Sequence, residues 1–300
     1  MDATHDVAAE LARLDEKVNA LLPPRYQHCY GSVSPVSMGS AGLVYGPDGR
    51  VAWDQIWTTF CDLALAGGPP HRGRLLEPVP EAEARSDPGR YRDAVGEIDR
   101  AIGLTSGFPV VDGDRPGWVG LPCRSAEEAA WLQFAVTAEN VSARRRGRVL
   151  QLPAGPAFRA EKEIKNVVVA LAKACHYWEG HLTESQQALA GDEPWEPASP
   201  DEAAADPAGY EASERQVRDA LRRAGLPMPA RRSIGWAGVE ADGEEAAVWL
   251  LRAVLADGVL ARREGRILHL PVAAAPDEAR AARIGAALAH AHRLWSACSP

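Results

Sequence analysis

The apolar positions near the start of the chain recur with helical spacing. Valines and leucines follow one another in steps of four and three residues, at Val7, Leu11, Leu14, Val18 and Leu21. This spacing places them on one helix face, and Pro23-Pro24 would end the helix. We predict an amphipathic helix that packs on its own domain. The alternative is a short helical seam in a homodimer, because the heptad is strict although it spans fewer than three repeats.

The pattern of residues 25–79 differs from the rest of the chain and has no second copy. Alternating apolar residues flank a Gly-Pro-Asp-Gly turn at 46–49, which predicts a β-hairpin. A helix is expected from Asp54 to Leu65, ended by Gly67-Gly68-Pro69-Pro70. We expect Arg72 and its neighbour His71 on the loop that follows.

An internal duplication organises the remaining residues. A shift of 118 positions lays Trp118 on Trp236, Trp131 on Trp249 and residues 143–153 on 261–271. Each copy reads helix, strand, helix, hairpin, helix, and Ser125 is positioned to cap the middle helix of the first copy. Six of the nine tryptophans form equivalent pairs, so we predict that they anchor the cores.

These patterns predict an α+β protein in which an N-terminal helix and a β-hairpin/helix unit precede two homologous α-β-α-ββ-α repeats. We place the N-terminal helix and unduplicated segment at 1–90, repeat A at 91–182, and repeat B at 210–300. Residues 183–209 are acidic, rich in Pro and Ala, and without periodicity. They are therefore expected to be a linker.

Composition narrows the class of protein. The 300 residues carry a formal net charge of −8, which disfavours general affinity for nucleic acid or anionic membranes. We find no signal-peptide pattern and no apolar run of the roughly 18 residues that a membrane span needs, so a cytoplasmic location is expected. The five cysteines are odd in number and form no C-x-x-C pair, which argues against a disulfide framework. Heavy use of Ala, Arg, Gly and Pro resembles bacterial high-GC coding.

Polar residues present in only one copy are candidates for function. The last helix of repeat A carries Glu163, Lys165 and Asn166, whereas the last helix of repeat B is richer in alanine. Helical spacing puts Glu163 and Asn166 on one face, with Lys165 beside it. His176 lies further along this helix. Solvated charges on an exposed face are the alternative interpretation.

A metal site is not expected near His176. Cys175 and His176 are adjacent, and His176 and His181 are five apart, whereas ligands on one helix need a spacing of three or four. No motif identifies a cofactor.

Our working hypothesis is a bacterial cytoplasmic enzyme acting on a small anionic metabolite, with its site between the unduplicated segment and repeat A. His71 and Glu163 would be the catalytic acid/base groups, and the substrate would be bound by Arg72, Lys165, Asn166 and His176. Cα atoms of His71 and Glu163 more than about 15 Å apart would exclude a shared site.

Two alternatives come from other classes of protein. A non-catalytic binding or scaffold protein would expose apolar surface at equivalent positions of both repeats. Nucleic-acid binding would use the paired basic hairpins, whose arginines recur at Arg144, Arg145, Arg148, Arg262, Arg263 and Arg266. Each repeat is expected to have one helix between its strand and its hairpin, whereas a helix-turn-helix needs two. This difference argues against nucleic-acid binding.

Overall fold

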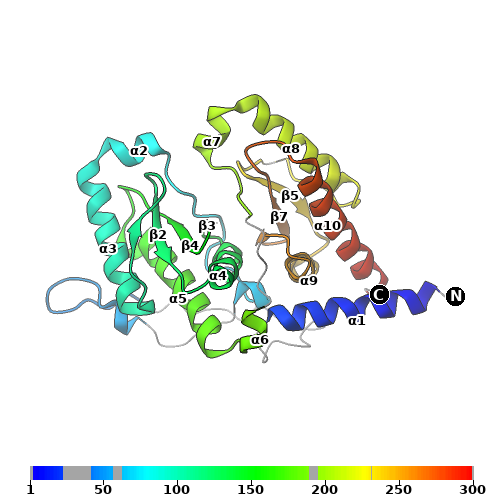
Figure 1. Ribbon diagram of the computed structural model, residues 1–300, viewed down its shortest axis with the longest axis horizontal. Helices are drawn as coiled ribbons and strands as arrows, with labels where there is room; N and C mark the ends of the chain where they lie inside the picture. Colours follow the sequence, from blue (N-terminus) through cyan, green and yellow to red (C-terminus); the bar gives the residue numbers. More distant parts are fainter. Residues whose placement is uncertain (1–2, 23–41, 57–62, 189–194, 231, 299–300) are drawn as a thin grey trace.

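The computed structural model describes residues 3–22, 42–56, 63–188, 195–230 and 232–298. It mixes helices with two separate antiparallel sheets, which confirms the α+β class. Figure 1 shows the two sheets side by side, each with its own helices, and α1 (Ala3–Leu21) running beneath the second of them. None of the helices in the described ranges combines the length and the hydropathy needed to cross a membrane.

The N-terminal helix α1 packs within its own chain. It contacts α9 (Glu244–Ala256) and α10 (Glu278–Cys298) of the second sheet. Leu14 and Val18 are 3% and 1% exposed as a result. The apolar face predicted from the spacing is therefore covered by helices of the same chain. This packing explains the apolar spacing without a homodimer.

The unduplicated segment has little regular structure where it is described. The turn predicted at 46–49 is present: Tyr45 pairs with Val51, and the Gly46 N–H donates to the Arg50 carbonyl at 2.8 Å. Two short 3-10 turns follow, η2 (Trp53–Gln55) and η3 (Ala64–Ala66). Half of the helix predicted from Asp54 to Leu65 falls on residues 57–62, outside the described ranges. The cysteines Cys29 and Cys61 also lie outside these ranges.

The first sheet unit follows the predicted element order. Its elements are α2 (Glu81–Ser86), α3 (Pro88–Ser106), β1 (Val111–Asp112), β2 (Trp118–Pro122), α4 (Ala126–Ala138), β3 (Arg144–Arg146), β4 (Val149–Pro153), the π-helical turn η4 (Ala160–Ile164) and α5 (Lys165–Gly180). The strands lie in the order β1-β2-β4-β3. Helix α4 packs on β3 and β4, and α5 packs on both α3 and α4.

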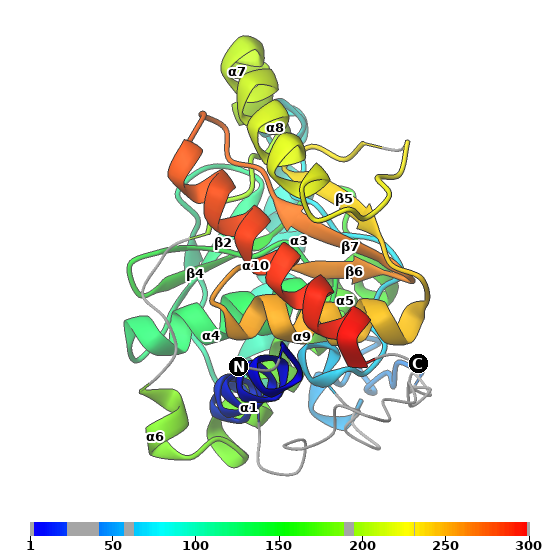
Figure 2. The ribbon, with the colours of Figure 1, turned by 90° about the vertical axis from the view of Figure 1, so that its right-hand side faces the viewer.

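The second sheet unit has the same plan, without a counterpart of β1 among its described residues. Its elements are α7 (Pro200–Ala205), α8 (Pro207–Arg222), β5 (Trp236–Glu240), α9, β6 (Arg262–Glu264), β7 (Ile267–Pro271) and α10. The order β5-β7-β6 corresponds to β2-β4-β3, and Trp236 faces Pro271 as Trp118 faces Pro153. Figure 2 shows α10 crossing in front of this unit, with α9 and α1 below it.

The described parts of the 183–209 segment, residues 183–188 and 195–209, contain regular structure. It contains α6 (Glu184–Gln187) and α7, and both begin with a capping box, at Thr183 and Ser199. Trp195 is 1% exposed, and its indole N–H donates to the Gly258 carbonyl at 2.8 Å. Short capped helices of four and six residues are below the length at which apolar periodicity can be read.

The paired tryptophans are core residues, as predicted. Trp118, Trp131, Trp178, Trp236 and Trp249 are all buried, and Trp295 packs against the core while half-buried. Trp131 packs against Trp178 with ring centroids 5.8 Å apart, and Trp249 packs against Trp295 at 5.7 Å, the rings being tilted by 44° and 47°. Each pair joins the middle helix to the last helix of its unit.

Candidate functional site

A buried carboxylate fastens the unduplicated segment to the first sheet unit. Glu139, at the end of α4, accepts a hydrogen bond from the Ala64 N–H at 3.0 Å through Oε1 and from the His71 N–H at 2.7 Å through Oε2. The Lys173 ammonium on α5 lies 2.7 Å from Oε1. Burial of this carboxylate is tolerated because donors and a counter-charge surround it.

The next residue, Asn140, holds the same segment to the second sheet. Its side-chain amide donates to the carbonyls of Arg72 and Arg263, each at 2.8 Å, and its Oδ1 accepts from Arg262. Asn140 has a φ of 60°, a left-handed conformation that asparagine adopts more readily than most residues. The loop carrying His71 is therefore fixed between the two units.

The imidazole of His71 lies at the start of α5. It is hydrogen-bonded to the Asn166 side chain, and the ammonium groups of Lys173 and Lys165 are close enough to affect its charge. Burial, assisted by these two ammonium groups, lowers the pKa of His71 to about 4, although Glu139 and Asn166 oppose the shift. The ring is therefore neutral at pH 7.

The structure brings together three of the residues predicted from the sequence. His71, Lys165 and Asn166 form one cluster, although about 95 positions separate the loop from the helix. Arg72 belongs to the same loop: its N–H donates to the Glu139 carbonyl at 3.3 Å and its Nε donates to the Arg74 carbonyl at 3.1 Å. Its guanidinium is thus directed along its own loop.

Glu163 and His176 each have a hydrogen-bond partner outside the cluster of His71, Lys165 and Asn166. The Glu163 carboxylate accepts from the Arg159 N–H at 3.1 Å within the π-helical turn η4. His176 lies ten residues beyond Asn166 on α5, which is about 15 Å along a helix. Its Nε2 lies 3.0 Å from Nε2 of His181. His176 is therefore placed away from His71.

Glu139 and Lys173 were not identified from the sequence. A signal was present, because Lys173 is the only charged side chain in the apolar run from Val167 to Trp178. A lone charge in such a run indicates a buried partner. Nothing local to the sequence indicates that the partner is Glu139.

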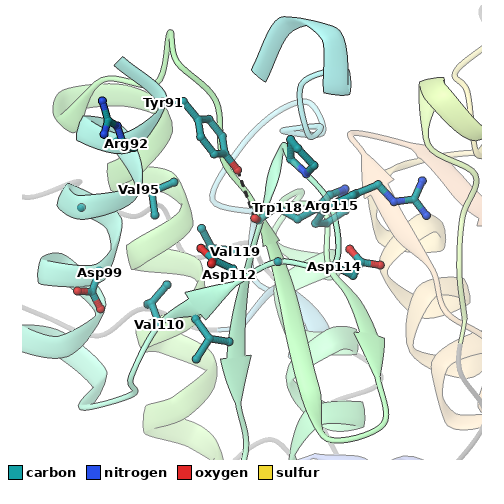
Figure 3. Close-up of a pocket in the computed structure, with 14 residues that line it drawn as sticks. Tyr91, Arg92, Val95, Asp99, Val110, Asp112, Asp114, Arg115, Trp118 and Val119 are labelled. Atoms are coloured by element: carbon teal, nitrogen blue, oxygen red, sulfur yellow. Dashed lines mark hydrogen bonds between the residues drawn. The ribbon is translucent and has the colours of Figure 1, made fainter. Parts of the chain in front are cut away.

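A separate groove lies between α3 and the edge strand β1 (Figure 3). Its volume is about 530 Å³. Tyr91 closes one end, where its hydroxyl accepts from the Gly117 N–H at 3.0 Å and lies 3.4 Å from the Trp118 carbonyl. Burial raises the pKa of this phenol. Sequence reasoning did not single out this groove, which exists only once α3 and β1 are adjacent.

Most arginines of the two basic hairpins are buried or paired with carboxylates of the same chain. Arg144, Arg145, Arg262 and Arg263 are each no more than 5% exposed. Arg144 lies 4.1 Å over the Trp118 ring and pairs with Asp114, and Arg262 lies 4.8 Å over Trp236 and pairs with Glu264. Guanidinium groups stacked on indoles inside the protein cannot contact a phosphate backbone.

Within the described residues, no three His, Cys, Asp or Glu side chains are grouped as a metal site. Cys123 and Cys175 are buried thiols whose pKa values are raised by burial, that of Cys123 to about 12. Neither thiol is suited to act as a nucleophile at neutral pH.

No protein-family model matches this chain, and no curated protein or solved structure matches it significantly.

Proposed function

We propose that the protein binds a small anionic metabolite where the 63–76 loop meets the start of α5, with His71, Lys165 and Asn166 as the contacting groups. The single observation that supports this is the hydrogen bond between His71 and Asn166, with Lys165 nearby. This hydrogen bond joins a residue of the unduplicated segment to a residue of α5 that has no asparagine counterpart in α10.

The electrostatics of the cluster favour an anion. Beyond the effect of burial, Lys173 and Lys165 lower the His71 pKa, whereas Glu139 raises it. Glu139 compensates Lys173 directly at 2.7 Å. The side-chain NH2 of Asn166 supplies hydrogen-bond donors and Lys165 supplies charge, while the ring N–H of neutral His71 is donated to Asn166.

We further propose that this site is enzymatic, with His71 as the proton acceptor. A neutral imidazole can accept a proton at pH 7, but its low pKa makes it a weak base until an anion binds beside it and raises that pKa. Glu163 would be the second acid/base group, and it must first leave its hydrogen bond to the Arg159 N–H. The bacterial and cytoplasmic setting belongs to the same proposal.

The binding proposal can be tested by titrating the protein with inorganic phosphate and with acetate. The ring protons of His71 would be followed by NMR, and heat by calorimetry. We expect saturable binding, accompanied by an upward shift of the His71 pKa, that is weakened in Lys165→Met and Asn166→Ala. Lys162→Met is the matched control, because Lys162 is an exposed lysine on the adjoining turn. Equal binding by Lys165→Met and Lys162→Met would refute the site.

We infer that the two sheet units are copies of one ancestral unit, as the shift of 118 residues predicts. Equivalent strand orders, registers and tryptophan pairs support this inference. Because five of the six paired tryptophans are buried, they offer no exposed surface of the kind that the scaffold alternative requires.

A further inference from the structure

The groove beside α3 lies apart from the residues of the His71 cluster. Its volume of about 530 Å³ falls in the range of small-molecule sites, roughly 300 to 1,000 Å³. Apolar side chains cover its middle, with Val95 from α3 opposite Val110 and Val119 (Figure 3). Carboxylates lie on both walls: Asp99 on the helix and Asp112 on β1.

We propose that this groove binds a small organic cation, an ammonium group carried on a short hydrocarbon chain. Asp112 would bind the ammonium, and Asp99 would add negative potential from the opposite wall. The hydrocarbon would cover Val95, Val110 and Val119. This site is independent of the anion site at His71, and it involves other elements and the opposite charge.

The charges of the lining support a cation. Asp114 is already paired with Arg144 and Arg146, and Arg115 is paired with Glu202 at 2.8 Å. Within the described ranges, Asp99 and Asp112 have no ion-pair partner. The remaining cation, Arg92, donates from Nε to the Pro88 carbonyl at 3.2 Å, at the end of the groove nearest the start of α3. The two carboxylates therefore outweigh the one guanidinium.

The second sheet unit shows that the fold does not require an open groove here. Tyr91 corresponds to Tyr210, and each hydroxyl accepts from the N–H of an equivalent glycine. With the offset of 119 positions that lays Tyr91 on Tyr210, Val95 corresponds to Glu214 and Asp99 to Arg218. Glu214 pairs with Arg218 at 3.7 Å and with Arg232 at 3.5 Å. An ion pair thus occupies in one unit the positions that are apolar and acidic in the other.

Gly96 leaves room on the helix wall. It lines the groove in the interior of α3, where glycine is unfavourable for a helix. A Cβ built there meets nothing within 4 Å. A larger side chain at this position would therefore extend into the groove without disturbing the core.

The test is titration with n-butylamine at low ionic strength, using calorimetry and NMR shifts of the Val95 and Val119 methyl groups. n-Butanol and butyrate serve as ligand controls. We expect butylamine to bind, and Asp112→Asn to weaken it by about tenfold, the effect of one charge-assisted hydrogen bond. Asp99→Asn should weaken it less. Asp93→Asn should leave it unchanged, because Asp93 is exposed on the same helix outside the groove.

A second pair of variants tests the location. Gly96→Leu should abolish binding by filling the groove, whereas Gly103→Leu should not, since Gly103 lies on α3 away from it and also has open space. Butanol or butyrate binding as tightly as butylamine would overturn the proposal, as would unchanged affinity in Asp112→Asn. Lys165→Met should not affect butylamine binding, which separates this result from the outcome at His71.

Discussion

The Lys173 ammonium lies 2.7 Å from the Glu139 carboxylate, and the two side chains are 2% and 0% exposed. The same carboxylate accepts the N–H groups of Ala64 and His71. One ion pair thus joins α4 to α5 and fixes the loop that carries His71. It is the contact on which the geometry of the proposed anion site most depends.

Removing one partner of this pair should be strongly destabilising. We expect Glu139→Gln and Lys173→Met each to lower the free energy of unfolding by about 3 to 5 kcal/mol, because each leaves a buried charge uncompensated. The double variant should cost less than the sum of the two, since neither charge remains. Urea unfolding measures all three.

The matched control is an exposed pair. Arg222 pairs with Asp219, and their side chains are 61% and 51% exposed. Asp219→Asn should change the free energy of unfolding by less than about 1 kcal/mol. Losses below that value in both Glu139→Gln and Lys173→Met would contradict the described burial.

The His71 pKa predicts a pH dependence of stability. The folded value of about 4 is below the unfolded value of about 6.5, so between these values the unfolded chain binds more protons. The stability contributed by neutral His71 is complete above about pH 6.5 and is lost as the pH falls toward 4. The loss is up to about 3 kcal/mol, and it should be absent in His71→Gln when both proteins are unfolded in urea across this range.

Neighbouring variants should shift the His71 titration in opposite directions. Lys165→Met removes an ammonium and should raise the pKa of His71, while Asn166→Ala removes a hydrogen bond that favours the charged ring and should lower it further. The ring-proton chemical shifts of His71 report both. Shifts of the same sign in the two variants would show that the described surroundings are wrong.

The buried hairpin arginines predict weak affinity for polyanions. Four of them are enclosed, and exposed Arg266 pairs with Glu240 at 2.5 Å. On a protein of net charge −8, we expect no retention on heparin at physiological ionic strength. Elution only at high salt would restore the nucleic-acid interpretation, and Arg148→Ala, at an exposed position, would show whether a hairpin is responsible.

The sequence by itself determined the local elements. Apolar spacing located α1, and the hydroxyl of Ser125 caps α4 as predicted, accepting from the Glu128 N–H at 3.1 Å. The two sheets share a strand order, and five of the six paired tryptophans are buried, as expected of core residues. These features follow from periodicity and capping, which depend on neighbours a few residues away.

Only the tertiary structure decided which groups meet. Lys165 and Asn166 were chosen for their absence from the second copy, yet their position beside His71 depends on how the loop docks on α4 and α5. The same holds for Glu139 with Lys173, 34 positions apart, for Arg144 over Trp118, and for the groove between α3 and β1. Periodicity reports which face of an element is buried. It does not report what the face is buried against, because that is determined by the packing of segments distant in the chain.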